Sequence, residues 1–191
     1  VTVIMAKDTR EALAICSCNF YENPSKKFKL IGVTGTKGKT TTTFMIKEIL
    51  EKAGHKVGLI GTIATYINGR MVSESSRTTP ESIELQKTFA QMVEDGVEYV
   101  VMEVSSQSLK LHRVDGCAFD IVLFTNFSED HISEKEHPNM QDYFESKLKL
   151  FKMCDNGIIN VDDIQVAKIP KLFPESKIMT YGIDNYCEVL A

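Results

Sequence analysis

The chain has 191 residues, which is long enough for one sizeable hydrophobic core but short for two full domains. Its net charge of −4 gives no basic excess that would attract nucleic acid, so a polyanion-binding protein is not expected. Hydrophobic residues make up 43% of the sequence but form no run of about 18 residues, so neither a membrane span nor a signal peptide is predicted.

Residues 1–27 read as a short helix followed by a linker, and we interpret them as the tail of a preceding domain. Residues 28–191 would then form a central domain. The chain starts with Val1 rather than methionine, and its last residues read as an interrupted strand. We therefore expect a piece of a longer protein that lacks its C-terminal domain.

From residue 28 onward, short runs rich in β-branched and apolar residues alternate with stretches of helical periodicity. Asn68 and Gly69, between two β-rich runs, predict a hairpin over 65–72. The alternation predicts an α/β fold, with a mostly parallel sheet flanked by helices on both faces. The expected strands are 28–34, 56–62, 97–105, 119–126, 157–163 and 176–182, and the expected helices are 39–54, 78–96, 139–157 and a short one between the last two strands.

Three polar clusters follow predicted strands directly: Thr34–Thr40, Glu103–Ser106 and Thr125–His131. Ligands of parallel α/β sheets bind at the carboxyl ends of the strands. We therefore expect these clusters to meet in one composite active site.

The first cluster, within "IGVTGTKGKTTTTF" at 31–44, has the composition of a phosphate-binding loop. Gly35 and Gly38 would let backbone N–H groups point at phosphate oxygens, next to a helix start that favours anions. Lys39 would reach the β- and γ-phosphates, and the Thr40 hydroxyl would hold Mg²⁺. The commonest phosphate-loop pattern requires glycine where this sequence has Val33, and a strand-to-helix turn without a ligand is the alternative.

The stretch "GTKGKTT" resembles the loop of the Mur ligase superfamily, ATP-dependent amide-forming enzymes of peptidoglycan assembly. Folylpolyglutamate synthases share that superfamily, but their loop typically ends G-K-G-S, so Thr40-Thr41 favours the Mur side. The resemblance implies a P-loop-type central domain that uses ATP and Mg²⁺. The nucleotide-binding residues it implies are Gly35, Thr36, Lys37, Gly38, Lys39, Thr40 and Thr41. Lys37 stands where asparagine is commoner, and it could reach phosphate or face water.

Two further segments resemble the MurE-type branch of that superfamily. "SRTTPES" at 76–82 matches its Thr-Thr-Pro segment, although a threonine before Pro80 could also simply cap a helix. "VVMEVSSQSLKLHRV" at 100–114 matches its E-[VA]-S-S…H-R-V segment, which makes Glu103 a Mg²⁺ ligand. Leu111 replaces a glutamine that commonly contacts substrate there. The substrate-binding residues that the resemblance implies are Thr78, Thr79, Ser105 and Arg113.

The segments "FTNFSEDH" and "YFESK" complete the resemblance. By analogy His131 binds a second Mg²⁺, and Lys147 is carbamylated by CO₂ so that it becomes an anion able to bind the same metal. Taken alone, a histidine in an acidic loop and a lysine on a helix would more often be solvated. Carbamylation requires neutral amine, which burial of Lys147 would favour by lowering its pKa.

The resemblance implies an ATP-dependent ligase, with Lys39, His131 and Lys147 as catalytic residues. It would add the third amino acid to UDP-MurNAc-L-Ala-D-Glu through an acyl phosphate. Family members have three domains, and the last one binds the incoming amino acid, so this chain alone is expected to lack turnover. Five scattered cysteines without a C-x-x-C motif favour reduced thiols in the cytoplasm, and we expect a monomer.

Three alternatives remain from the sequence. A folylpolyglutamate synthase-like ligase is disfavoured by Thr40-Thr41 and by Thr78-Thr79-Pro80. A P-loop kinase or GTPase is disfavoured by Val33 and by the lack of an obvious N-K-x-D motif. A non-catalytic nucleotide-binding module with the same fold is disfavoured by the complete set of candidate catalytic side chains, and only an assay would exclude it.

Overall fold

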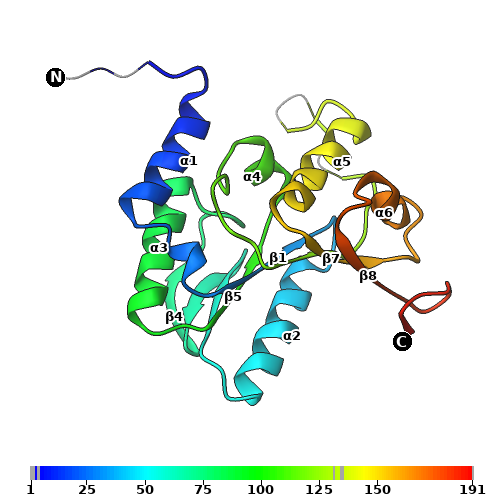
Figure 1. The fold of residues 1–191 in the computed structure, drawn as a ribbon, viewed down its shortest axis with the longest axis horizontal. Coiled ribbons are helices and arrows are strands. Elements are labelled where there is room, and N and C mark those ends of the chain that lie inside the picture. Colours follow the sequence, from blue (N-terminus) through cyan, green and yellow to red (C-terminus); the bar gives the residue numbers. More distant parts are fainter. Residues whose placement is uncertain (1–2, 4, 131, 134–135, 191) are drawn as a thin grey trace.

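The computed structural model describes residues 3, 5–130, 132–133 and 136–190. Within them, nine strands form one sheet in the order β4-β3-β2-β5-β1-β6-β7-β8-β9 (Figure 1). All neighbouring strands are parallel except the pairs β2–β3 and β3–β4, which confirms the predicted fold class. The strands are β1 (Lys29–Thr34), β2 (Val57–Ile60), β3 (Ala64–Ile67), β4 (Arg70–Glu74), β5 (Tyr99–Glu103), β6 (Ile121–Phe124), β7 (Asn156–Asn160), β8 (Lys177–Gly182) and β9 (Val189–Leu190).

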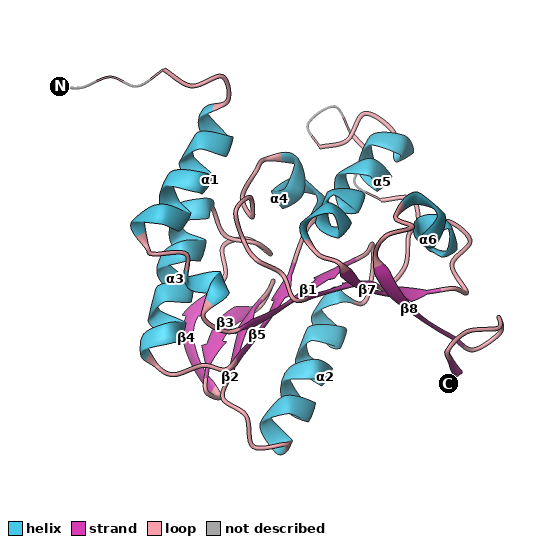
Figure 2. Ribbon diagram, in the orientation of Figure 1, coloured by secondary structure: helices cyan, strands magenta, loops and turns pink. Residues whose placement is uncertain are grey.

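Helices cover both faces of the sheet (Figure 2). Helix α2 lies alone on one face, and the other described α-helices lie on the opposite side. Short 3₁₀ helices occur at Pro24–Lys26, Lys149–Met153 and Val166–Lys168. The α-helices are α1 (Thr9–Phe20), α2 (Lys39–Lys52), α3 (Ser82–Glu94), α4 (Ser106–Lys110), α5 (Met140–Leu148) and α6 (Ile169–Leu172).

The central strands bury both faces, and alternate residues pack into two separate cores. In β1, Leu30 belongs to the larger core, whereas Ile31 and Val33 pack on the α2 side. This alternation follows from the two-residue period of a strand. Ile46 and Leu50 of α2 cover the smaller core, as the helical spacing of 39–54 predicts.

The hairpin predicted over 65–72 is formed by β3 and β4. Its turn residues Asn68 and Gly69 have φ of 50° and 78°, as a two-residue type I′ turn requires. The hairpin supplies the antiparallel edge of an otherwise parallel sheet.

Two helical predictions need adjustment, and one helix was not predicted. Helix α3 begins at Ser82 rather than 78 and its N-cap is Glu81, so the two threonines before Pro80 lie in a bend and do not cap it. Helix α5 ends at Leu148, and a 3₁₀ helix then leads into β7. Gly157 belongs to β7, where a Cβ atom would lie 2.7 Å from Phe151 Cε1, so this glycine permits close packing rather than stopping a helix. Helix α4 was not predicted, because its five residues are too few to show periodicity.

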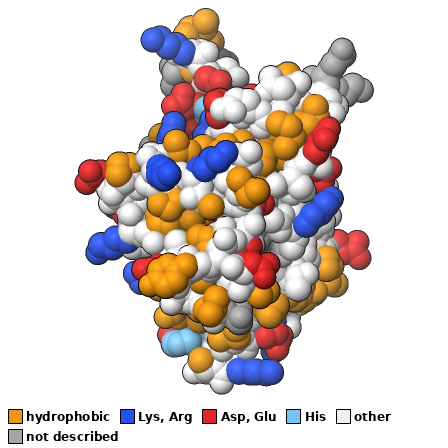
Figure 3. All heavy atoms as spheres, turned by 90° about the vertical axis from the view of Figure 1, so that its right-hand side faces the viewer, with side chains coloured by type: hydrophobic (Ala, Val, Ile, Leu, Met, Phe, Trp, Pro, Cys, Tyr) orange, Lys and Arg blue, Asp and Glu red, His pale blue; other side chains and the backbone are white. Residues whose placement is uncertain are grey.

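The N-terminal helix α1 packs against α3, and Arg10 pairs with Glu81 at 3.2 Å. At the other end of the sheet, apolar side chains lie among charged ones on the surface (Figure 3). Exposed apolar residues in α6, β8 and β9 include Leu172, Met179 and Leu190. Within the described residues, no helix combines the length and apolar character that crossing a membrane requires.

Candidate functional site

The predicted phosphate loop connects β1 to α2, and two glycines determine its shape. Gly35 has φ +147°, and any Cβ atom there would collide with the Thr125 hydroxyl. Gly38 has φ +83° and forms the left-handed N-cap of α2. Glycine is the residue that adopts these conformations without strain, so both positions depend on it.

The segment after β6 holds the loop in place. Asn126 accepts a hydrogen bond from Lys37 N at 2.9 Å and donates one to Lys37 O at 3.1 Å. Its carbonyl accepts from Thr36 N at 2.9 Å. Asn126 was not among the predicted site residues, although its position after a strand end was a usable signal.

Two lysines point at the loop from different elements. Lys39 Nζ donates to the carbonyls of Gly35 and Thr36 at 2.9 and 3.0 Å, and Lys147 Nζ donates to the same Gly35 carbonyl at 2.9 Å. Burial lowers the pKa of Lys39. Burial, followed by the charge of Lys39, holds the pKa of Lys147 well below its usual value. A neutral amine at Lys147 is therefore more accessible than at an ordinary lysine.

Of the other predicted loop residues, Thr36 is buried, whereas Lys37 and Thr41 are exposed. The sequence left open whether Lys37 reaches phosphate or faces water. In the structure it forms an ion pair with Asp130 at 2.6 Å, and its side chain is 73% exposed. Thr41 is exposed on the first turn of α2.

Glu103, at the end of β5, is buried and fully hydrogen-bonded. The Thr40 hydroxyl donates to its two carboxylate oxygens at 2.9 and 3.0 Å. Thr62 adds its backbone N–H at 2.9 Å and its hydroxyl at 3.1 Å. Thr62 was missed because it follows β2 without any motif. These bonds fix the carboxylate beside the start of α2.

The atoms that could coordinate a cation here, the Glu103 carboxylate and the Thr40 hydroxyl, are all oxygens, which fits Mg²⁺. Among the described residues no group of three or more His, Cys, Asp or Glu side chains forms a metal cluster, so a cation here would rely on Glu103, Thr40, waters and phosphate oxygens. His131, the other expected ligand from the acidic loop, lies outside the described residues.

The expected substrate residues divide into two groups. Thr78, Ser105 and Arg113 line a cavity, whereas Thr79 is fully buried behind it. The Thr79 hydroxyl donates to Glu103 O at 2.9 Å and accepts from Ser105 N at 3.1 Å. Thr79 therefore joins the two halves of the site through the backbone.

Arg113 is buried beside a carboxylate of its own chain. Its guanidinium lies 3.0 Å from Glu81, which also contacts Arg77 at 2.9 Å. Burial lowers the pKa of Arg113. Its Nε atom is buried and finds no hydrogen-bond partner in the described part of the chain.

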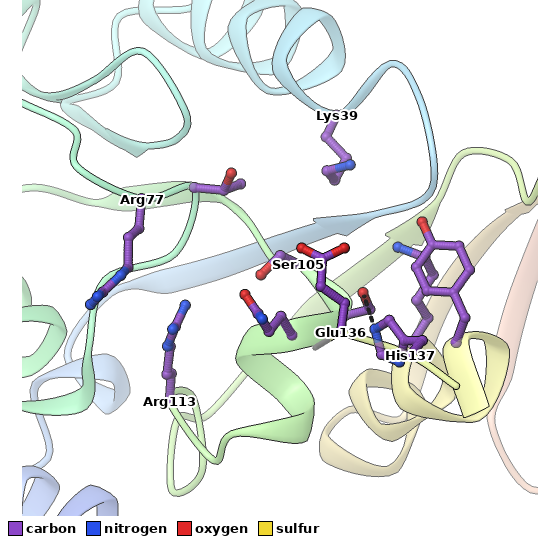
Figure 4. Close-up of a pocket in the computed structure, with 11 residues that line it drawn as sticks. Lys39, Arg77, Ser105, Arg113, Glu136 and His137 are labelled. Carbon is purple, nitrogen blue, oxygen red and sulfur yellow. Dashed lines mark hydrogen bonds between the residues drawn. The ribbon is translucent and has the colours of Figure 1, made fainter. Parts of the chain in front are cut away.

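The cavity has a volume of about 260 Å³ and unites the two sides of the site (Figure 4). Lys39 approaches it from the phosphate loop, Arg77 and Arg113 lie together on another side, and Ser105 lies between them. Several of its residues were not predicted, because they come from separate elements and carry no shared motif. The lining residues are Lys39, Arg77, Thr78, Ser105, Ser106, Gln107, Arg113, Glu136, His137, Tyr143 and Lys147.

A parallel sheet whose first strand leads through a glycine loop into a helix, with a polar cavity at the strand ends, defines a phosphate-loop α/β domain. The chain belongs to the Mur ligase family: the Mur ligase middle domain model matches residues 33–190. This membership removes the kinase and GTPase alternative.

The chain is also similar to individual curated proteins. It is 54% identical over 190 residues to the UDP-N-acetylmuramoyl-L-alanyl-D-glutamate–2,6-diaminopimelate ligase of Clostridium botulinum, covering 100% of this chain and 38% of that protein. The ligase of the same name from Clostridium tetani is 51% identical over 191 residues, covering 100% of this chain and 39% of the relative. The chain thus spans about two fifths of the length of these relatives.

The chain is also similar to solved structures of related enzymes. One UDP-N-acetylmuramoyl-L-alanyl-D-glutamate–2,6-diaminopimelate ligase matches with a TM-score of 0.80 and 25% identity, covering 95% of this chain and 38% of that one. The ADP complex of Mycobacterium tuberculosis folylpolyglutamate synthase matches with a TM-score of 0.73 and 12% identity, covering 94% of this chain and 49% of that one, which shows a shared fold.

Proposed function

We propose that the full-length protein is an ATP-dependent ligase that joins 2,6-diaminopimelate to UDP-MurNAc-L-Ala-D-Glu. One observation carries the proposal: a single cavity is lined both by Lys39 and Lys147 and by Thr78, Ser105 and Arg113. A reaction between a nucleotide and an anionic peptide needs both sets within reach of one another. The names of the similar curated proteins supply the choice of substrates.

ATP would bind at the phosphate loop, Gly35 to Thr41. Lys39 Nζ, now on the carbonyls of Gly35 and Thr36, would turn to the β- and γ-phosphates, which are stronger acceptors. Lys37, with its exposed side chain and its bond to Asp130, would contribute long-range charge rather than a fixed contact.

Mg²⁺ would be held by Thr40 and Glu103, and a second ion by His131 and carbamylated Lys147. The ions would neutralise phosphate charge while the phosphoryl group moves to the D-Glu carboxylate. The bonds from Thr62 support this assignment, because they orient Glu103 toward Thr40.

Lys147 has the surroundings that carbamylation requires. Its side chain is buried, and its pKa is lowered first by that burial. A neutral amine attacks CO₂ and loses a proton, which gives a carbamate with one remaining N–H. That N–H could keep the bond to the Gly35 carbonyl, while the two new oxygens face the cavity.

The UDP-sugar peptide would contact Thr78, Ser105 and Arg113, with Thr79 acting through the backbone. Arg113 lines the cavity with a positively charged guanidinium, which supports a contact to an anionic group. Gln107 lies one helical turn before Leu111 and lines the cavity, so its amide would replace the glutamine that position 111 lacks.

We further propose that residues 1–27 connect to a preceding domain and that 28–191 are the central ATP-binding domain, which agrees with a family match over 33–190. We also propose that the protein is a monomer and is located in the cytoplasm. All five cysteines are free, which is compatible with a reducing compartment.

Phosphate release by the full-length protein tests the proposed function. The assay contains ATP, Mg²⁺, UDP-MurNAc-L-Ala-D-Glu and, one at a time, 2,6-diaminopimelate, lysine and other amino acids. Release that requires both the nucleotide-sugar and 2,6-diaminopimelate supports the proposal. Release without the nucleotide-sugar rejects it, and absence of any release indicates a non-catalytic module.

A further inference from the structure

Three residues that were not predicted as site residues, Ser106, His137 and Asp142, form a chain of hydrogen bonds that ends at the wall of the cavity. His137 Nε2 lies 2.9 Å from Ser106 Oγ, and His137 Nδ1 lies 2.6 Å from Asp142 Oδ2. His137 is 1% exposed, and its ring packs 5.0 Å from that of Tyr143. This serine–histidine–aspartate arrangement is formed by α4, α5 and the segment before α5.

The partners determine which atoms carry protons. Asp142 also accepts from Lys110 Nζ at 2.8 Å, and this bond, the largest cause, lowers the pKa of Asp142. An ionised carboxylate only accepts hydrogen bonds, so His137 Nδ1 must donate to it. In a neutral imidazole Nε2 is then the acceptor, and the Ser106 hydroxyl donates to it. The lone pairs of Ser106 Oγ are left for another donor.

Ser106 and His137 line the same cavity as Lys39 and Lys147. Figure 4 shows His137, with its dashed bond to Ser106, on the side away from the two labelled arginines. Ser106 follows Ser105 directly in the chain. The reacting carboxylate, drawn toward the lysines and bound through Ser105, would therefore come close to Ser106. An amine attacking that carboxyl carbon would bring its N–H groups to the same wall.

We propose that Ser106 accepts the proton of the attacking amine and passes its own proton to His137, which Asp142 orients. This inference rests on the proposed ligase function. As the C–N bond forms, the N–H proton moves to Ser106 Oγ and the Ser106 proton moves to His137 Nε2. The acyl C–O bond breaks, phosphate leaves with the bonding electron pair, and the imidazolium later releases its proton to water. Ser106 is the catalytic residue in this step, and His137 and Asp142 are positioning residues.

The charges around His137 suit this role. Asp142 and Glu136 flank it, and Lys110 balances Asp142 while donating to the Glu136 carbonyl at 3.1 Å. The ring of Tyr143 covers one side, and Lys39 and Lys147 line the cavity beyond. An imidazolium formed during the reaction would be stabilised by the Asp142 carboxylate at 2.6 Å.

The test separates the two half-reactions in the full-length protein. Acyl phosphate is trapped with hydroxylamine in the absence of the amino acid, and amide formation is measured with 2,6-diaminopimelate across a pH series. The variants are Ser106→Ala and His137→Gln. Glutamine can keep both hydrogen bonds but cannot take up a proton. His55→Gln, at a histidine 3.5 Å from Glu98 and outside the cavity, is the matched control.

We expect both variants to form the hydroxamate within about 3-fold of the unmodified protein. Amide formation should fall by roughly 10²- to 10⁴-fold, the range for general acid–base groups, and kcat should lose its pH dependence. Equal losses in both half-reactions, unchanged amide formation, or a covalent acyl group isolated on Ser106 would overturn the proposal. If the unmodified protein forms no hydroxamate, the proposed ligase function itself fails, which is a separate outcome.

Discussion

Lys39 and Lys147 donate hydrogen bonds to the same backbone carbonyl, that of Gly35, at 2.9 Å each. Two ammonium groups that share one acceptor repel each other, and the charge of Lys39 contributes to the lowered pKa of Lys147. Bound phosphate would give Lys39 a better acceptor, and carbamylation would remove the positive charge of Lys147. Both changes would relieve the repulsion between the two lysines.

Replacing Lys147 by methionine should stabilise the protein at neutral pH. The folded pKa of Lys147 lies well below the unfolded value of about 10.4, so between the two the unfolded chain binds more protons and stability rises with pH. The cost of the buried ammonium is complete below the folded pKa and absent above the unfolded one. Lys147→Met should add about 1–4 kcal/mol at pH 7 and nothing above about pH 10.4. Urea denaturation in CO₂-free buffer measures this.

Lys47 provides the matched control for that substitution, because it is a buried lysine with carboxylate partners. Burial alone would lower the pKa of Lys47, but the hydrogen bond that Lys47 Nζ donates to the Glu51 carboxylate at 2.7 Å helps raise that pKa above its usual value. Lys47→Met should destabilise the protein by roughly 1 kcal/mol, because Glu51 loses a charged hydrogen bond. A Lys147→Met protein that is less stable than the unmodified one at pH 7 would contradict the assigned cost.

Thr62→Val should weaken binding of Mg²⁺·ADP without unfolding the protein. The substitution removes the hydroxyl that lies 3.1 Å from Glu103 and keeps the backbone N–H bond. Loss of such a supporting contact typically lowers metal affinity 10- to 100-fold. Calorimetric titration of the full-length protein measures the change. Thr88→Val, which removes an exposed hydroxyl bonded to Glu84 O, should leave the affinity unchanged. Equal affinities in the two variants would refute the role of Thr62.

Gly35→Ala should cost more stability than Gly54→Ala. Both glycines have positive φ, of 147° and 92°, so both substitutions strain the backbone. Nothing lies within 4 Å of a Cβ at Gly54, whereas a Cβ at Gly35 meets the Thr125 hydroxyl. We expect about 1 kcal/mol for Gly54→Ala and roughly 1–3 kcal/mol more for Gly35→Ala. Thermal and urea unfolding curves compare them, and equal losses would show that backbone strain alone matters.

Lys37→Ala and Lys39→Ala should separate two roles within one loop. Lys37 has a 73% exposed side chain in an exposed ion pair, so its loss should change stability by less than about 1 kcal/mol. We expect it to change ADP affinity by less than about 3-fold, whereas Lys39→Ala should lower it by at least 10-fold. Fluorescence titration with an ADP analogue measures both. A larger loss for Lys37→Ala would mean that it leaves Asp130 to bind phosphate.

Sequence patterns predicted those helices, strands and turns whose conformation depends on residues adjacent in the sequence. The apolar run at 28–34 predicted strand β1, and Asn68-Gly69 specified the turn of the β3–β4 hairpin. Helix α4 was not predicted, because a single helical turn is too short to show the helical period. The start of α3 was predicted too early, because a proline marks a boundary region and not an exact first residue.

The sequence by itself determined the fold class, the phosphate loop and the family, because glycine positions, strand periods and short motifs are encoded locally. Only the tertiary structure decided what surrounds each charged group. Thr62 reaches Glu103 because β2 lies beside β5, and Asn126 supports the loop because β6 lies beside β1. The lowered pKa of Lys147 and the chain from Ser106 to Asp142 depend on burial and on contacts between distant segments, and strand order creates both.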